Sequence, residues 1–404
     1  MTFSVKFPFF IFLILCLAGC SAKDESRTLT LTMSLAEQEW KVFREDIFPP
    51  FEKKFNVKIQ AYQIESGQLA TKLEALQIAG KQEIDLFAQD NMSLAILINK
   101  DLVLDLCEYE SQIPQPIMFQ LIASCKFNNR LMFMPFRPNV QIVYYNSDAF
   151  TRYNLEPPKT WDELLKVAKK LKELEGQGRI LLKAFGGTPT ATQIYEFVLQ
   201  AGGEPYSFDD AGCIEAFKFL QELWPYASEE SRRAKWDTTN EILARQQAYL
   251  AQNWPFGITV LIQEYKLDFI KTYSGWAGPE GEYHVIGGDV FGIPKNSRQK
   301  TLALEFIRYM HSQEVQEILL SKLGWPSLRE DVYAKVPSWQ REPFAAVQQA
   351  LRHGVLRENV PWWPAYAKYI SEAFREIVIE KAPVEETLKI YKEKLEKEKS
   401  LYDS

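Results

Sequence analysis

The chain has 404 residues, of which 46% are hydrophobic and 25% are charged, a composition typical of a soluble globular protein. It carries 47 Lys and Arg against 53 Asp and Glu, and the net charge of −6 argues against nucleic acid as a partner. One hydrophobic core rarely grows beyond about 250–300 residues, so this length predicts two domains.

The first twenty residues have the anatomy of a secretory signal. Lys6 precedes an apolar run over 7–17, which is shorter than the roughly 20 residues that a spanning helix needs. The run closes on Leu17-Ala-Gly-Cys20, which resembles the lipobox of bacterial lipoproteins, whose cysteine is lipidated and becomes the mature N-terminus. We therefore expect residues 1–20 to be a lipoprotein signal and residues 21–27 a polar tether. An ordinary cleaved signal with a chance cysteine is the alternative.

The first part of the mature chain alternates between strand and helix patterns. Strands are expected at 29–33, 57–62 and 84–88. Between them, the apolar stripe from Trp40 to Phe55 predicts a helix kinked near Pro49-Pro50, and 69–79 predicts a second helix ended by Gly80. Strands alternating with helices of this length are typical of parallel βαβ units, so the fold class is α/β.

The alternation continues through the rest of the chain. Strands at 131–136 and 140–145 flank Arg137-Pro138-Asn139, a connection too short for a helix and suited to a crossover between domains. Thr160-Trp-Asp-Glu163 has the capping-box spacing, which predicts a helix to about Glu175. Further helices are expected at 190–201, 213–223, 239–250, 301–322, 341–353, 365–380 and 384–399. No long linker separates two domains, so we expect the chain to cross between them more than once.

Motifs of the common enzyme classes are absent from the sequence. The three histidines, His284, His311 and His353, do not form a His-Glu-x-x-His arrangement, and there is no Gly-x-Ser-x-Gly elbow or phosphate-binding glycine loop. Asp209-Asp210 could supply paired carboxylates, but their place before an apolar helix favours a helix cap. We therefore expect neither catalytic residues nor a metal or cofactor.

The cysteines divide by location. Cys16 lies in the signal and Cys20 is the proposed lipid site, which leaves Cys107, Cys125 and Cys213 in the mature body. An oxidising compartment permits a disulfide between Cys107 and Cys125, and free thiols at both positions are the open alternative.

Three loops concentrate aromatic rings beside Pro or Gly. They are Asn253-Trp-Pro-Phe256, Trp276 with its neighbouring glycines, and Pro361-Trp-Trp-Pro364. A flat ring can pack on the C–H face of a sugar while nearby Asp, Asn or Arg side chains bind its hydroxyls. A single Trp is more often part of a core, but three such loops together favour sugar binding.

A further signal comes from several stretches in their order along the chain. They are Pro135–Asn146, Pro157–Leu164, Gln200–Gly203, Ala251–Pro255, Gly287–Ser297, Ala303–Ile307, Ser312–Gln316 and Gly324–Ser327. Together they resemble the maltodextrin-binding-protein-like family of extracellular sugar-binding proteins of ABC importers, and the resemblance covers essentially the whole mature chain.

The resemblance implies two α/β lobes that are joined by a hinge and close on a ligand. Lobe 1 would comprise 28–136 with a return segment at about 268–325. Lobe 2 would comprise 140–265 with C-terminal helices at about 328–400. The implied protein is an exported monomer without catalysis that hands its sugar to the membrane subunits of an ABC transporter. Lipid at Cys20 would hold it on a bacterial membrane, facing the periplasm or the cell exterior.

The resemblance also implies ligand-binding residues. Asp90 matches a position where the family often has a sugar-binding acid. Asn139 stands where the maltodextrin-binding protein has Glu, and Asp289 where many relatives carry Trp, so we expect a mono- or disaccharide or a polyol glycoside before a longer oligosaccharide. The full expected set is Glu37, Gln38, Trp40, Asp90, Asn139, Thr190, Trp254, Asp289, Trp362 and Trp363.

Three alternatives stay open at this point. A binding protein for a polyamine or metal complex would favour an acidic or anion-clamping cleft over stacked rings. A lipid-anchored glycan-processing enzyme would need two carboxyl groups about 5 to 10 Å apart across the cleft. A purely structural envelope lipoprotein would respond to no ligand.

Overall fold

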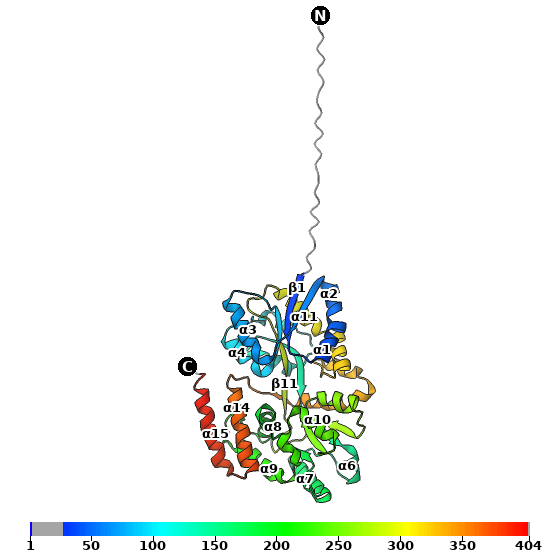
Figure 1. Ribbon diagram of the computed structural model, residues 1–404, viewed down its shortest axis with the longest axis vertical. Helices are drawn as coiled ribbons and strands as arrows, with labels where there is room; N and C mark the ends of the chain where they lie inside the picture. Colours follow the sequence, from blue (N-terminus) through cyan, green and yellow to red (C-terminus); the bar gives the residue numbers. More distant parts are fainter. Residues whose placement is uncertain (2–26, 403–404) are drawn as a thin grey trace.

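The computed structural model describes Met1 and residues 27–402. Residues 2–20 of the expected signal, which include the lipid site at Cys20, and residues 21–26 of the tether lie outside the described residues. Figure 1 shows two lobes, one above the other, with the long strand β11 (His284–Gly292) reaching from the upper lobe towards the lower one. None of the helices within 27–402 is both long enough and apolar enough to cross a membrane.

The upper lobe, lobe 1, is built on a six-stranded sheet in the order β12-β11-β3-β1-β2, with β6 paired to β11. β1 is parallel to β2 and β3, whereas β11 runs antiparallel to β3 and β6. The other strands of this sheet are β1 (Arg27–Met33), β2 (Val57–Gln63), β3 (Leu86–Asp90), β6 (Met134–Val140) and β12 (Gly354–Leu356). A separate two-stranded hairpin joins β4 (Lys126–Phe127) to β5 (Arg130–Leu131).

Helices of lobe 1 bury their apolar faces against this sheet. Phe43, Phe87 and Phe306 are fully buried and belong to one hydrophobic cluster. The irregularity expected near Pro49-Pro50 is a π-helical segment, η1 (Phe43–Ile47), between α1 (Glu37–Val42) and α2 (Phe48–Phe55). The remaining helices are α3 (Ser66–Ile78), η2 (Asn91–Ser93), α4 (Ala95–Asn99), η3 (Cys107–Gln112), α5 (Phe119–Ala123), α11 (Lys300–Met310), α12 (Gln313–Ile318) and η7 (Leu319–Leu323).

The lower lobe, lobe 2, has a four-stranded sheet in the order β10-β7-β9-β8. Its strands are β7 (Ile142–Asn146), β8 (Ile180–Leu181), β9 (Leu250–Asn253) and β10 (Ile270–Tyr273). The helices that follow these strands are α6 (Ser147–Arg152), α7 (Trp161–Glu175), α8 (Gly187–Gln200), α9 (Ala211–Leu223), η4 (Trp224–Tyr226), η5 (Glu229–Arg233), α10 (Trp236–Ala244) and η6 (Ile258–Glu264).

From α14 onwards the chain packs on lobe 2. Val378 and Tyr391 share a buried cluster with Phe197 of α8, and Figure 1 shows α14 and α15 side by side on one flank of this lobe. A third cluster, which includes Val140, Ile142 and Ile286, packs where the two sheets meet. The C-terminal elements are η8 (Glu330–Lys335), η9 (Ser338–Gln340), α13 (Arg341–Arg352), α14 (Trp363–Phe374), η10 (Arg375–Ile379) and α15 (Val384–Lys399).

Two expected boundaries between the lobes are wrong. Arg137-Pro138-Asn139 is not a connection, because these residues pair with β11 inside β6 and only Gln141 separates β6 from β7. The return to lobe 1 does not begin at about 268, because β10 pairs with β7 in the sheet of lobe 2. The chain re-enters lobe 1 with β11.

The structure also corrects two expected helices and the expected disulfide, and it confirms one expected helix cap. The helix expected at 301–322 is divided, because Ser312 caps α12 by accepting a hydrogen bond from the Val315 amide. The helix expected at 239–250 ends at Ala244, and Leu250 already belongs to β9. Cys107, Cys125 and Cys213 are free thiols, so the structure contains no Cys107–Cys125 disulfide. The cap expected at Asp210 is confirmed, since its carboxylate accepts from the Cys213 amide at 2.7 Å.

Candidate ligand cleft between the lobes

A cavity of about 610 Å³ lies between the two lobes, a volume within the usual range of ligand pockets. Lobe 1 contributes side chains from the end of β3 and from α3 and α4, and lobe 2 contributes Thr188, Trp236 and Trp254. Arg137 and Asn139 of β6 and residues 287–289 of β11 also line it. The segment between β12 and α14 completes the wall with Arg357, Val360 and Pro361, and the start of α14 adds Trp363 and Pro364.

A second cavity, of about 780 Å³, shares Arg137 and Asn139 with the first. Gln38, Glu39 and Trp325 line it from lobe 1, and Phe256, Thr259 and Gln263 from lobe 2. The cleft therefore continues on both sides of the end of β6.

Strand ends place two carboxylates side by side in the first cavity. Asp90 is the last residue of β3 and faces Asp289 of β11 in the antiparallel register. The Asp90 carboxylate accepts a hydrogen bond of 2.8 Å from the Met92 amide, which starts the short helix η2. Burial, together with the like charge of Asp289, raises the pKa of Asp90.

Arg137 forms ion pairs with two acids of the cleft, Asp289 and Glu39. Its guanidinium lies 2.5 Å from Asp289 Oδ2 and 3.2 Å from Glu39 Oε1, and it stacks over the Trp325 ring at 4.5 Å. Trp325 Nε1 donates to the same Glu39 oxygen at 2.9 Å. Burial alone would lower the pKa of Arg137, but Asp289 and Glu39 outweigh it and the pKa is raised. The negative charge of Asp289 is thus balanced by the positive charge of Arg137.

The backbone of β11 approaches β6 closely at Gly288. This residue has φ of +118°, and a Cβ there would lie 2.0 Å from the carbonyl oxygen of Arg137. A β-bulge follows between Asp289 and Val290. Glycine at this position allows the strand to turn Asp289 towards Arg137.

Two tryptophans of lobe 2 meet at the cavity. Trp254 and Trp236 make an edge-to-face contact with ring centroids 5.9 Å apart. Tyr144 donates to the Trp254 carbonyl at 2.9 Å, and the Trp254 ring packs against Gly287 of β11. The Trp236 Nε1 atom is buried without an acceptor among the described residues.

Arg357 lies in the wall formed by the segment between β12 and α14. Its side chain is buried, its Nη1 donates to Thr192 Oγ1 at 2.8 Å, and its guanidinium stacks over Trp363 at 4.9 Å. Burial lowers the pKa of Arg357, against the opposing charge of Asp90.

Six of the ten expected ligand-binding residues line the cleft. Asp90, Asn139, Trp254, Asp289 and Trp363 line the first cavity, and Gln38 lines the second, which it shares with Asn139.

The other four lie outside both cavities. Glu37 is an exposed partner of Arg44 at 2.7 Å, and Trp40 is buried and donates to Gln63. Thr190 is buried and donates to the Lys183 carbonyl, whereas Trp362 packs edge-on against Tyr206. These four side chains serve local packing and hydrogen bonding.

Arg137, Arg357 and Trp236 were not expected in the site. Arg137 had a visible signal, a charge within an apolar strand pattern. Arg357 had none, because β12 has only three residues and its partner strand is far away in sequence.

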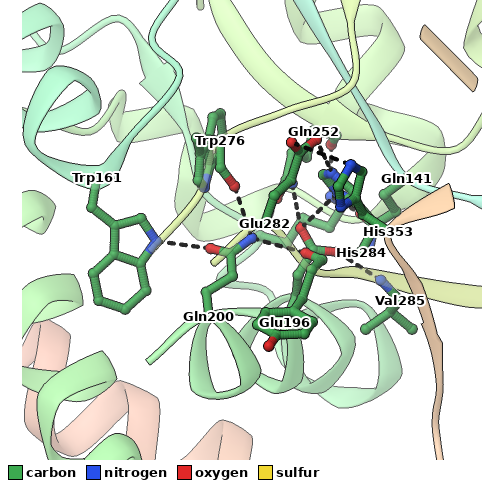
Figure 2. A network of polar contacts seen from close by, with 12 residues as sticks. Gln141, Trp161, Glu196, Gln200, Gln252, Trp276, Glu282, His284, Val285 and His353 are labelled. Atoms are coloured by element: carbon green, nitrogen blue, oxygen red, sulfur yellow. Dashed lines mark hydrogen bonds and ion pairs between the residues drawn. The ribbon is translucent and has the colours of Figure 1, made fainter. Parts of the chain in front are cut away.

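A buried polar network holds the crossovers between the lobes (Figure 2). Lys183 Nζ donates to Gln141 Oε1, at the first crossover between β6 and β7, and to the Gln252 carbonyl. Gln252 in turn donates to Glu196, whose second oxygen accepts from the Val285 amide at the start of β11. The network therefore ties these two crossovers, from β6 to β7 and from β10 to β11, to α8.

His284 is the first residue of β11 and lies at the second crossover, where the chain returns from lobe 2 to lobe 1. Its Nε2 is 2.9 Å from Glu282 and its Nδ1 is 3.6 Å from Glu196, and its amide donates to the His353 carbonyl beside β12. Burial would lower the pKa of His284, but the two carboxylates outweigh it and raise the pKa to about 9. No group of three or more His, Cys, Asp or Glu within 27–402 has the arrangement of a metal site.

Comparison with known proteins finds one matching family model and several relatives. The family model of the bacterial extracellular solute-binding proteins matches residues 46–346. A probable amino-acid ABC transporter periplasmic-binding protein of Sinorhizobium fredii is 27% identical over 199 residues, 46% of this chain and 45% of that one. The maltotriose-binding protein of Pyrococcus abyssi is 26% identical over 285 residues, 65% of this chain and 58% of that one. The chain thus spans about half the length of the curated relatives that it matches.

The structural comparison supports the fold. The sugar-binding protein of Xanthomonas citri superposes with a TM-score of 0.81 at 17% identity, covering 93% of this chain and 99% of that one. The expected two-lobed α/β fold is confirmed.

Proposed function

The chain belongs to the bacterial extracellular solute-binding proteins, and we propose that it captures a sugar between its lobes and delivers it to the membrane subunits of an ABC importer. The observation that carries this proposal is the 610 Å³ cavity, whose wall comes from both lobes. A ligand that contacts both lobes stabilises the closed form, and the population of that form then reports the bound ligand to the transporter.

The sugar class is supported by the chemistry of the cavity wall. The Trp236 and Trp254 rings offer apolar surface, and Asp90 and Asn139 offer groups that bind hydroxyls. The names of the matched maltotriose-binding and sugar-binding proteins point the same way. We assign ligand contacts to Gln38, Asp90, Asn139, Trp254, Asp289 and Trp363.

The mode of attachment is part of the same proposal. Leu17-Ala-Gly-Cys20 supports lipidation at Cys20, which would keep an exported, monomeric binding protein close to its membrane partner. The protein would bind and release its solute without chemical change.

Thermal unfolding of the purified protein against mono- and oligosaccharides, polyols, polyamines and metal salts tests the proposal. A ligand that binds only the folded state stabilises it by roughly 2.7 kcal/mol at a hundredfold excess over its dissociation constant. We expect an upward shift with a sugar or polyol that is recovered unchanged. A shift only with polyamine or metal, or hydrolysis of an oligosaccharide, would contradict the proposal.

A further inference from the structure

Arg357 carries a buried positive charge without a carboxylate in contact. Its side chain is 7% exposed and lines the first cavity, yet no ion pair joins it to any residue of the described chain. A buried charge is costly unless it is paired, so a buried arginine in a cavity wall calls for an anionic partner. The other arginine of this cavity, Arg137, has two such partners.

One edge of the Arg357 guanidinium has no hydrogen-bond partner within the described chain. Nη1 donates to Thr192, which is the one hydrogen bond of this guanidinium within 27–402. Nε is buried without an acceptor. Nε and Nη2 form the edge that can bind a carboxylate or phosphate through two parallel hydrogen bonds.

The surroundings fix this guanidinium in place. Thr192 on α8 holds one end, and the Trp363 ring covers one face at 4.9 Å. Both supports belong to lobe 2, whereas Asp90 stands at the end of a lobe 1 strand and acts on Arg357 through its charge. Because Arg357 is held rigidly, little side-chain freedom is lost when a ligand binds.

Neither of the two acids in the wall of the first cavity forms an ion pair with Arg357 within the described chain. Asp289 is paired with Arg137, and the pKa of Asp90 is raised by burial and by Asp289. Of the two arginines that line this cavity, Arg357 is the one that forms no ion pair within the described chain.

We propose that Arg357 binds an anionic group of the solute, a phosphate or a carboxylate, and that the solute is a hydroxylated anion such as a sugar phosphate or sugar acid. This inference rests on the proposed function, since it takes the cleft as the solute site. Asp90 and Asn139 then bind hydroxyl groups of the same molecule, and Trp236 and Trp254 flank its C–H surface.

Matched pairs of ligands test the inference by calorimetry. Glucose is compared with glucose 6-phosphate and glucuronate, glycerol with glycerol 3-phosphate and glycerate, and inorganic phosphate is measured alone. We expect at least one anionic compound to bind about tenfold or more tightly than its neutral parent, and its affinity to fall as salt is added. The phosphate and carboxylate arms distinguish the two kinds of anion.

Variants assign the effect to one residue. Arg357→Gln should remove the preference for the anionic member of the pair, whereas Arg357→Lys should keep part of it. Arg44→Gln, a surface arginine paired with Glu37, is the control and should leave all affinities unchanged. If Arg357→Gln fails to fold, Arg357→Lys and the wild-type pairs decide the matter.

The outcomes separate this inference from the proposed function. Equal binding of neutral and anionic members, or equal weakening of both in Arg357→Gln, would overturn the inference. Binding of neutral sugars with rejection of every anion would also overturn it while leaving the proposed function intact. If no hydroxylated compound binds, charged or neutral, both fail.

Discussion

Lys183 donates a hydrogen bond of 2.9 Å to Gln141, the single residue between β6 of lobe 1 and β7 of lobe 2. The ammonium group is fully enclosed, and burial lowers the pKa of Lys183 to about 7 against the opposing charge of Glu196. The second acceptor of Lys183 is the Gln252 carbonyl, at 2.7 Å. A titratable group is therefore built into the first crossover.

Replacing Lys183 with methionine should destabilise the protein. The change leaves Gln141 Oε1 and the Gln252 carbonyl without their donor, which costs about 1–3 kcal/mol in buried positions. Urea unfolding at pH 7 measures the loss. Lys218→Met removes an exposed ion pair with Glu385 and should change the free energy of unfolding by less than about 0.5 kcal/mol. Equal effects of the two variants would show that the Lys183 contacts contribute nothing specific.

His284 should give the protein a stability that is lost in alkali. Its folded pKa of about 9 exceeds the ordinary value of 6.5, so the folded state binds more protons than the unfolded state between these values. The contribution is complete below about pH 6.5 and disappears as the pH rises through 9. Denaturant unfolding of wild type and His284→Gln at several pH values should show a difference that shrinks over this window. A difference independent of pH would contradict the charged state of His284.

His311 should act in the opposite direction. Burial lowers the pKa of His311 to about 4, despite its hydrogen bond to the Pro135 carbonyl, so the unfolded state binds more protons between pH 4 and 6.5. Stability that depends on neutral His311 is then lost as the pH falls through this range. His311→Gln should unfold with a weaker dependence on pH between 4 and 6.5 than wild type, measured by the same denaturant series. An unchanged dependence would show that His311 does not titrate in this way.

The fold was predictable because strand and helix patterns repeat along the whole chain. Thr160 and Asp210 cap helices as their spacing predicts. The lobe boundary at Arg137–Asn139 was misplaced because strand pairing with β11 depends on residues about 150 positions away, and a three-residue polar segment carries no sign of that partner.

The site was predictable at strand ends and less so on helices and loops. Asp90 ends a strand, where side chains enter a cleft. Trp40 was misplaced because it continues the apolar stripe with Phe43 and belongs to the core. Trp362 and Trp363 are neighbours in sequence, but only Trp363 lines the cavity, since the turn into α14 sends the two rings in different directions.

Gly288→Ala should distort the floor of the cleft. An alanine Cβ would lie 2.0 Å from the Arg137 carbonyl and would also require a left-handed φ of +118°. Gly186→Ala is a matched control, because Gly186 has φ of +104° but open space around its Cβ position. Both variants should lose stability from backbone strain, of order 1–3 kcal/mol, and Gly288→Ala should lose more and also bind ligand more weakly. Equal behaviour in thermal unfolding and calorimetry would show that the close approach of β11 to β6 is unimportant.

Trp254→Ala and Trp362→Ala should separate ligand binding from stability. Trp254 lines the cavity beside Trp236, so its removal deletes apolar ligand contact and should weaken binding of the solute by about tenfold or more. Trp362 contacts Tyr206 and Lys399 outside the cavity, so its loss should reduce the free energy of unfolding while leaving the dissociation constant within about twofold. Calorimetry with the ligand that stabilises wild type most, and urea unfolding of both variants, measure the two quantities.

If Trp362→Ala weakens binding as much as Trp254→Ala does, the ligand extends beyond the cavity to the Trp362 ring, and the assignment of the site must change. If Trp254→Ala binds like wild type, the ligand contacts lie in the second cavity, around Gln38 and Trp325.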